Sequence, residues 1–125
     1  MQLSEDEFSA GDVVRSVGAD RVVLGSGERR TSFVIAAGVP AFDWPVDDVQ
    51  LLRPEHCDVL IALQPAVLLL GTGPTQRFPT RDVLAHFLTR GIGIEVMDNA
   101  AAARTYNVLL GERRKVAAAF VIPPV

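Results

Sequence analysis

The residues best suited to ligand binding lie in the glycine-containing loop at positions 71–79. This loop holds Gly71 and Gly73, follows the apolar run 66–70 and precedes a helical pattern over residues 80–90. A turn from a buried strand into a helix places backbone N–H groups and a helix N-terminus at one edge of a sheet, where small anions and polar ligands bind. The sequence therefore predicts a ligand-binding edge at this loop, although it shows no recognisable catalytic group there.

Two arginines and a second helix start accompany the loop. Arg77 and Arg81 flank the N-terminus of the helix that Thr80 should cap, and Asp98 or Asn99 should cap the next helix at the same edge. Arginines at this end of a helix oppose its dipole unless an anion or a partner carboxylate lies nearby, whereas two solvated side chains are the plainer alternative. The candidate ligand-binding residues are Gly71, Gly73, Arg77, Thr80, Arg81, Asp98 and Asn99.

Other chemistries find little support in the sequence. The glycine loop matches neither a P-loop nor a dinucleotide fingerprint, so a tight structural turn explains it as well as a ligand cradle does. His56 and His86 lie on different predicted helices, with His86 expected in solvent, and no spacing indicates a metal site. Cys57 is the single cysteine, which excludes an internal disulfide, and we expect it to be buried. Asp47-Asp48 is better explained by a solvated turn than by paired-carboxylate catalysis. We therefore predict no catalytic residue, metal or cofactor.

Composition favours one soluble domain. The chain has 125 residues, of which 49% are hydrophobic, and a formal net charge of −3. Residues 1–10 form an acidic stretch that we interpret as a loose arm before a domain at 11–125. Nucleic-acid binding is disfavoured because no concentrated basic patch exists. The absence of a signal peptide and of a ~20-residue apolar run predicts a cytoplasmic protein without membrane insertion.

The second half of the chain alternates between strands and helices. A strand at 66–70, a helix at 80–90, a strand at 92–97, a helix at 100–110 and a strand at 115–122 are predicted. Both crossovers are long enough for parallel connections, so a partly parallel sheet covered by helices is expected. The apolar stripe of the first helix is Val83, Leu84, Phe87 and Leu88.

The first half predicts an antiparallel β meander with strands at 13–17, 21–24 and 29–37. Phe33 and Ile35 should share one face of the third strand. Two prolines should keep residues 38–46 irregular, with Trp44 clamped onto the core, and residues 47–49 should add a short edge strand. Pro54 should open a short helix over roughly 55–62.

Helical phase predicts the faces of the last helix. Ala102, Ala103 and Tyr106 should face the core, Arg104 should lie on the opposite, exposed face, and Asn107 should lie at the margin. An amide at such a margin more often braces neighbouring backbone through hydrogen bonds than performs catalysis.

Together these motifs resemble a known family. The stretch 91–110, the Gly71-Thr72-Gly73 loop, Phe78-Pro79 and Trp44-Pro45 are similar to the Mth938-like family of small uncharacterised α/β domains, over roughly residues 11–122. That family includes bacterial and archaeal proteins, a mitochondrial assembly factor of respiratory complex I and an adipogenesis-associated vertebrate protein. The resemblance implies a three-layer α/β domain with a mixed, partly parallel central sheet, helices and an additional N-terminal antiparallel β element. It implies no enzymatic activity. This sequence has Ala103 where many bacterial relatives carry a cysteine, so a thiol role there is absent.

Two functional hypotheses follow. The first is a non-enzymatic interaction or assembly-type domain with a protein partner, acting as a monomer or small homo-oligomer. The second is a small-molecule or anion-binding protein, or an enzyme, that uses the loop 71–79, Arg77, Arg81 and the Asp98-Asn99 cap. A bound anion on the loop N–H groups would favour the second hypothesis, and a loop without ligand beside an exposed apolar patch would favour the first.

Overall fold

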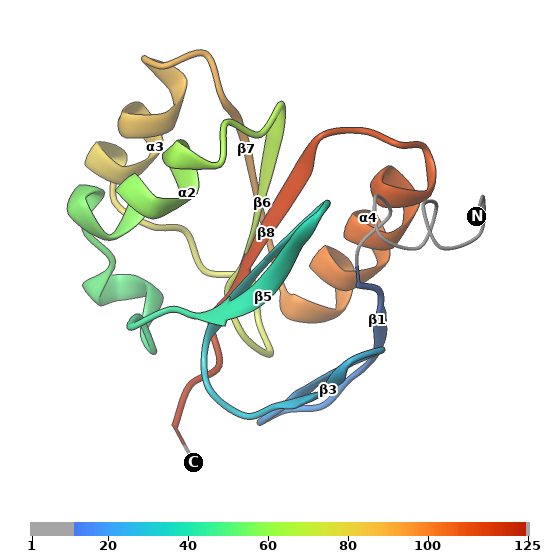
Figure 1. Ribbon diagram of the computed structural model, residues 1–125. Helices are drawn as coiled ribbons and strands as arrows, with labels where there is room; N and C mark the ends of the chain where they lie inside the picture. Colours follow the sequence, from blue (N-terminus) through green and yellow to red (C-terminus); the bar gives the residue numbers. More distant parts are fainter. Residues whose placement is uncertain (1–11, 125) are drawn as a thin grey trace.

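The computed structural model describes residues 12–124; the acidic arm expected at 1–10 lies outside the described residues. Two sheets and the helices around them make up the fold (Figure 1). The strands of the smaller sheet are β1 (Val14–Val17), β2 (Val22–Leu24) and β3 (Gly27–Arg29). The strands of the larger sheet are β4 (Phe33–Ala36), β5 (Val39–Asp43), β6 (Val67–Gly71), β7 (Gly93–Met97) and β8 (Val116–Phe120). The helices are η1 (Val49–Leu51), η2 (Pro54–Cys57), α2 (Asp58–Ala62), α3 (Arg81–Leu88) and α4 (Asn99–Gly111).

The larger sheet is mixed, in the order β5-β4-β8-β6-β7. Strand β6 runs parallel to both β7 and β8, while β4 pairs antiparallel with β5 and β8. The expected parallel pairing of the strands at 66–70 and 92–97, with a helix between them in sequence, is confirmed. Crossovers of this kind carry helices onto the faces of the sheet, which hides both faces of the central strands.

Helices cover the two faces of the larger sheet separately (Figure 1). On one face Leu68 and Leu70 of β6 join a core with α2 and α3, and on the other Leu69 joins α4 and the smaller sheet. Strand β6 is therefore buried along its whole length and reads as a continuous apolar run rather than as an alternating one. In α3, Val83 and Phe87 are buried, but Leu88 of the predicted stripe is 61% exposed.

The predicted third strand at 29–37 is wrong as a single element. The chain leaves the smaller sheet after β3 and enters the larger one at β4. Between them, the buried Ser32 accepts a hydrogen bond from Ile122 N through Oγ (2.8 Å) and one from Trp44 N through its carbonyl (2.9 Å). These bonds fix the crossing point. The predicted common face of Phe33 and Ile35 is confirmed, since both enter the core beneath α4.

Two predictions for the middle of the chain are corrected. Residues 39–43 form strand β5 despite Pro40, because β5 is at the end of the sheet, where a missing N–H costs no ladder bond. The edge strand expected at 47–49 does not form; instead Asp48 accepts a hydrogen bond from Gln50 N (2.9 Å) and caps η1. Trp44 is anchored as expected: it is 4% exposed and its Nε1 donates to His56 O (3.0 Å).

Candidate functional site

The glycine loop and the start of α4 meet at the carboxyl end of the parallel strands, as the sequence predicted. Thr72 N donates to Met97 O (2.9 Å), which joins the ends of β6 and β7. Asn99 N donates to Gly73 O (2.9 Å), and Gly73 N donates in return to Asn99 Oδ1 (3.0 Å). This reciprocal pair ties the loop to the first residue of α4.

Asn99 uses both ends of its amide inside the protein. Its Oδ1 accepts from Gly73 N, its Nδ2 donates to Val121 O (3.0 Å), and the residue is only 4% exposed. One side chain therefore holds together the loop, α4 and the chain after β8. Such a satisfied, buried amide acts as a structural brace.

The two glycines of the loop have separate geometric causes. A Cβ at Gly71 would collide with Asn99 Oδ1 and would lie 3.1 Å from the ring of Phe120. Gly73 has a φ of 102°, a conformation that strongly favours glycine. Packing against Asn99 and the turn of the loop therefore account for both glycines.

Thr72 closes the rest of the loop. Its Oγ1 donates to Thr75 O (2.7 Å) and accepts from Arg77 N (3.0 Å), and the residue is buried. Farther along, Gln76 Nε2 donates to Val96 O (2.9 Å) on the edge strand β7. The N–H groups of Thr72, Gly73 and Arg77 are therefore all bonded to acceptors within the chain.

The two helix starts differ. Asp98 caps α4 through a hydrogen bond from Ala101 N to Oδ1 (2.8 Å), so a carboxylate of the chain itself occupies that N-terminus. Thr80 lies at the N-cap of α3, as predicted, but its side chain makes no capping hydrogen bond. Arg81 is exposed in the first turn, beside Asp82. The charge of the α3 N-terminus is thus the less compensated of the two.

Arg77 faces a cavity of about 210 Å³ between the loop, the η1 segment and the chain after β8. Asp47 and Asp48 line the same cavity, yet Arg77 forms no ion pair within 4.0 Å with any described residue. The candidate residues thus divide into two groups. Gly71, Gly73, Asp98 and Asn99 bond or pack internally, whereas Arg77, Thr80 and Arg81 remain open to solvent.

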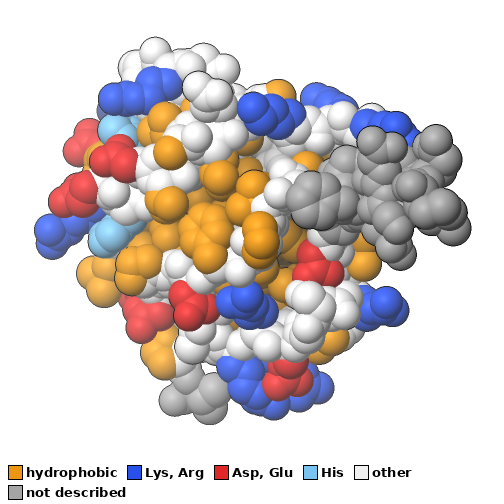
Figure 2. Space-filling model, in the orientation of Figure 1, with side chains coloured by type: hydrophobic (Ala, Val, Ile, Leu, Met, Phe, Trp, Pro, Cys, Tyr) orange, Lys and Arg blue, Asp and Glu red, His pale blue; other side chains and the backbone are white. Residues whose placement is uncertain are grey.

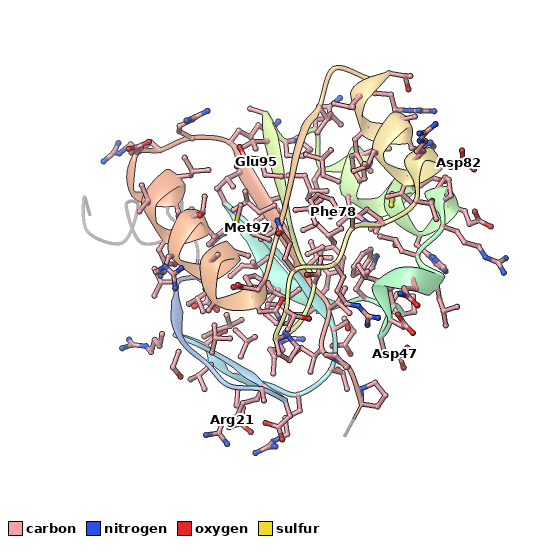
Figure 3. The ribbon with its side chains drawn as sticks, turned by 180° about the vertical axis from the view of Figure 1, so that it is seen from behind. Arg21, Asp47, Phe78, Asp82, Glu95 and Met97 are labelled. Atoms are coloured by element: carbon pink, nitrogen blue, oxygen red, sulfur yellow. The ribbon has the colours of Figure 1, made fainter. Side chains whose placement is uncertain are left out.

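The same loop exposes an aromatic side chain. Phe78 is 65% exposed, whereas the following Pro79 is buried. Figure 3 shows Phe78 on the loop that crosses the back of the molecule, between β7 and α3. Leu51, which lines the cavity beside Arg77, is 67% exposed. Sequence reasoning did not select Phe78 as a site residue, although an aromatic group outside any strand or helix period was a usable signal.

A second apolar area lies on the face of the molecule opposite to the one seen in Figure 3. Hydrophobic side chains gather in the middle of the face seen in Figure 2, over β5 and toward α2. The backbone edge of β5 is partly covered, because Arg29 Nη2 donates to Ala41 O (2.9 Å) and Nη1 pairs with Asp43 (2.9 Å). This arginine blunts the strand edge against pairing with another chain.

The two histidines and the cysteine make contacts that stabilise the fold. His86 was expected in solvent, but its Nε2 lies 2.9 Å from Asp58 Oδ1 and its side chain is only 19% exposed. His56 Nδ1 accepts from Arg53 N (3.0 Å) at the start of η2. Cys57 is buried, and burial, with smaller effects of Asp58 and Glu55, raises the pKa of its thiol to about 12. Within residues 12–124, no group of three acidic, histidine or cysteine side chains is arranged to hold a metal ion.

Helical phase placed the residues of α4 correctly. Ala102, Ala103 and Tyr106 are buried and Arg104 is exposed. Asn107 braces the smaller sheet: its Oδ1 accepts from Val14 N (3.0 Å) and its Nδ2 donates to Val14 O (2.8 Å). The Tyr106 hydroxyl is buried and has no hydrogen-bond partner among residues 12–124, and burial, followed by the charge of Asp12, raises its pKa.

Comparison with known proteins places the chain in a family. The model of a family described as a protein of unknown function, DUF498/DUF598, matches residues 14–121. The chain belongs to this family. Within the part of the chain that the structure describes, no helix is both long and apolar enough to cross a membrane.

Two relatives match most of the chain. The chain is 28% identical over 117 residues to the 13 kDa major membrane protein of Francisella tularensis subsp. holarctica, covering 93% of this chain and 95% of that protein. It is 31% identical over 128 residues to the NADH dehydrogenase (ubiquinone) 1 alpha subcomplex assembly factor 3 of Danio rerio, covering 99% of this chain and 72% of that protein. The family therefore includes relatives named as assembly factors, which confirms the resemblance inferred from the sequence.

Solved structures of relatives share the fold. An NMR structure of a Xanthomonas campestris protein is 46% identical with a TM-score of 0.82, covering 89% of this chain and 84% of that chain. A crystal structure of a Bordetella parapertussis protein is 30% identical with a TM-score of 0.86, and the match covers 93% of this chain and 99% of that chain. A Bordetella pertussis protein described as a Mth938-like domain, 24% identical with a TM-score of 0.79, supports the fold alone. The predicted α/β architecture is therefore confirmed.

Proposed function

We propose that this protein is a non-enzymatic interaction domain of the assembly-factor type, and that it binds a protein partner through the surface around Phe78 and Leu51. The observation that carries this proposal is an exposed aromatic side chain on a loop whose own N–H groups at Thr72, Gly73 and Arg77 are bonded internally. Exposed apolar groups of this size lose unfavourable contact with water when a partner covers them.

The similarity to proteins named as assembly factors supports the same proposal. Aromatic side chains are also among the residues that contribute most to binding energy at protein interfaces. Binding in the cytoplasm, as a monomer or small homo-oligomer, is part of the proposal, as is the absence of nucleic acid among its partners.

The test is affinity purification from the native cell with three forms of the protein. The wild type, Phe78→Asp and Val108→Asp are compared quantitatively; Val108 is the matched control because it is an exposed apolar residue (58%) on α4. A partner should be retained by the wild type and by Val108→Asp and lost from Phe78→Asp. If all three forms retain the same proteins in equal amounts, the surface is not the one proposed.

A second function, binding of a small anion, is favoured by one observation. Arg77 lines the 210 Å³ cavity and has no ion-pair partner among the described residues, and the α3 N-terminus beside it lacks a side-chain cap. In this alternative Arg77, Thr80 and Arg81 contact the anion, while Gly71, Gly73, Asp98 and Asn99 hold the loop in shape.

Titration with phosphate, nucleotides and acidic metabolites tests the alternative by amide NMR. Shifts should cluster at residues 71–82 and 98–99 in the wild type and weaken in Arg77→Ala. Added salt should also weaken binding, because the attraction is largely between charges. If no shifts cluster at these residues, the anion-binding alternative is wrong and the interaction function is the remaining proposal.

A further inference from the structure

The end strands of the two sheets differ in how well their free edges are protected. At β1, the side-chain amide of Asn107 bonds to both Val14 N and Val14 O. Strand β3 is only three residues long. Strand β5 contains Pro40, and Arg29 donates to Ala41 O on its edge. Short length, proline and side-chain cover all hinder the pairing of a sheet edge with another chain.

Strand β7, at the other end of the larger sheet, is the exception. It has five residues and no proline, and it pairs with β6 in one continuous register from Gly93 to Met97. Within residues 12–124, no strand pairs with its outer side. Among the described side chains, only the exposed Gln76 donates a hydrogen bond to this outer edge, at Val96 O (2.9 Å). Strand β7 therefore presents a regular edge with little cover.

Two hydrogen bonds show which backbone groups of β7 point outward. Met97 O accepts from Thr72 N on the side of β6, whereas Val96 O accepts from Gln76 on the opposite side. Successive residues of a strand direct their N–H and C=O groups to opposite edges. Ile94 and Val96 therefore direct theirs outward, where an added strand can reach them.

The two faces of β7 have different chemistry. Ile94 and Val96 pack on the core beneath α2 and α3, and Phe78, which is 65% exposed, lies on the same side. Glu95 points to the side of α4, as Met97 does (Figure 3). The Glu95 side chain is exposed and forms no ion pair within 4.0 Å with any described residue. An added strand thus meets an aromatic ring on one face and a carboxylate without an ion pair on the other.

We propose that the protein partner adds an extended segment to the outer edge of β7, with apolar side chains beside Phe78 and basic side chains opposite Glu95. This inference rests on the proposed function and specifies the chemistry of its partner. In strand addition, main-chain hydrogen bonds supply affinity and alternate side chains supply specificity. An incoming N–H replaces Gln76 at Val96 O, so that exchange conserves the hydrogen bond.

Charge disfavours a second copy of this chain as the occupant. When two β7 edges pair antiparallel with full overlap, Ile94 of one copy faces Val96 of the other, and the two Glu95 side chains face each other. Like charges directly opposite destabilise a strand pair. A segment that alternates apolar and basic residues forms an opposite-charge pair at this position instead.

Amide hydrogen exchange with a designed peptide tests the proposal. The probe is a capped peptide of about eight residues that alternates valine and lysine, which is the length of an ordinary strand. In the free protein, the amides of Ile94 and Val96 should exchange faster than those of Glu95 and Met97, which face β6. With peptide at about ten times its Kd, exchange at Ile94 and Val96 should slow about tenfold, because only unbound protein exchanges.

Peptide and protein variants separate backbone pairing from side-chain contact. N-methylation of the peptide residues whose N–H groups face β7 keeps every side chain and should abolish the protection. Glu95→Lys should transfer binding to a peptide that alternates valine and glutamate. The matched control is Glu55→Lys, which changes an exposed acidic residue on η2 and should keep the preference for the valine–lysine peptide.

Three outcomes would overturn the proposal. The first is the absence of peptide binding at millimolar concentration. The second is binding that leaves exchange at Ile94 and Val96 unchanged, or that survives N-methylation. The third is protection of these two amides that grows with protein concentration in the absence of peptide, which would assign the edge to a second copy.

Purification from the native cell separates a failure of this inference from a failure of the proposed function. A partner that is lost from Phe78→Asp but retained in full by Glu95→Lys would leave the interaction function standing and overturn the basic segment on β7. A partner that is retained by Phe78→Asp would instead overturn the proposed function itself.

Discussion

Replacing Asn99 by Ala should strongly destabilise the fold, because both ends of its side-chain amide are hydrogen-bonded inside the protein. The change removes the hydrogen bond from Gly73 N to Oδ1 and the bond from Nδ2 to Val121 O, both in buried positions. Each buried group left without a partner costs about 1–3 kcal/mol, so the loss of unfolding free energy should be roughly 2–6 kcal/mol. A small domain has only about 5–15 kcal/mol to lose.

Urea denaturation followed by fluorescence of Trp44 measures this effect. With an m value of about 1–3 kcal/mol per molar urea, the midpoint should fall by on the order of 1–3 M. Asn107→Ala is the matched control, because it also removes two amide hydrogen bonds but from a half-buried position. It should cost less, since water can reach the freed groups of Val14.

Asn99→Asp separates hydrogen bonding from size. The aspartate keeps an acceptor for Gly73 N but places an oxygen against Val121 O. A buried carboxyl in this position should have a raised pKa, so its neutral form can donate to Val121 O and the variant should lose stability as pH rises. A change below about 0.5 kcal/mol in Asn99→Ala, the range of ordinary surface substitutions, would refute the reasoning.

Three further predictions rest on single residues. Trp44→Ala should lower the free energy of unfolding by roughly 3–5 kcal/mol in urea denaturation, because it removes a buried indole; an unchanged midpoint would contradict this. Tyr106→Phe should leave thermal stability unchanged or raise it, since it removes a buried hydroxyl that has no hydrogen-bond partner in the described part of the chain, and a clear loss of stability would contradict this. Cys57 should not react with a thiol dye at pH 8 until urea is added. Because its pKa is raised to about 12, the unfolded chain releases this proton first, and the stability of the wild type relative to Cys57→Ala should decline as pH rises from about 9 toward 12.

The sequence determined much of the second half of the fold. Gly91, the cap at Asp98 and the apolar runs of β6 and β8 are local signals, and the parallel strands and the helix phases followed from them. The buried and exposed faces of α4 could be predicted because helical period alone sets them, down to the bracing role of Asn107. Motifs in this half also pointed to the family.

Tertiary structure alone decided the points that depend on distant residues. Residues 29–37 alternate like one strand, but hydrogen bonds from Ile122 and Trp44 to Ser32 divide them between two sheets. Pro40 is compatible with a strand only because β5 is at a sheet edge, a position that local sequence does not encode.

The glycine loop shows the same division within the candidate site. Local sequence predicted its turn, its place at the sheet edge and the helix starts beside it. Whether its N–H groups are free depends on Asn99, twenty-six residues beyond Gly73, and whether Phe78 is exposed depends on how α3 and β7 pack beside it. Hydrogen-bond satisfaction and burial are properties of residues brought together by folding, so a local pattern cannot specify them.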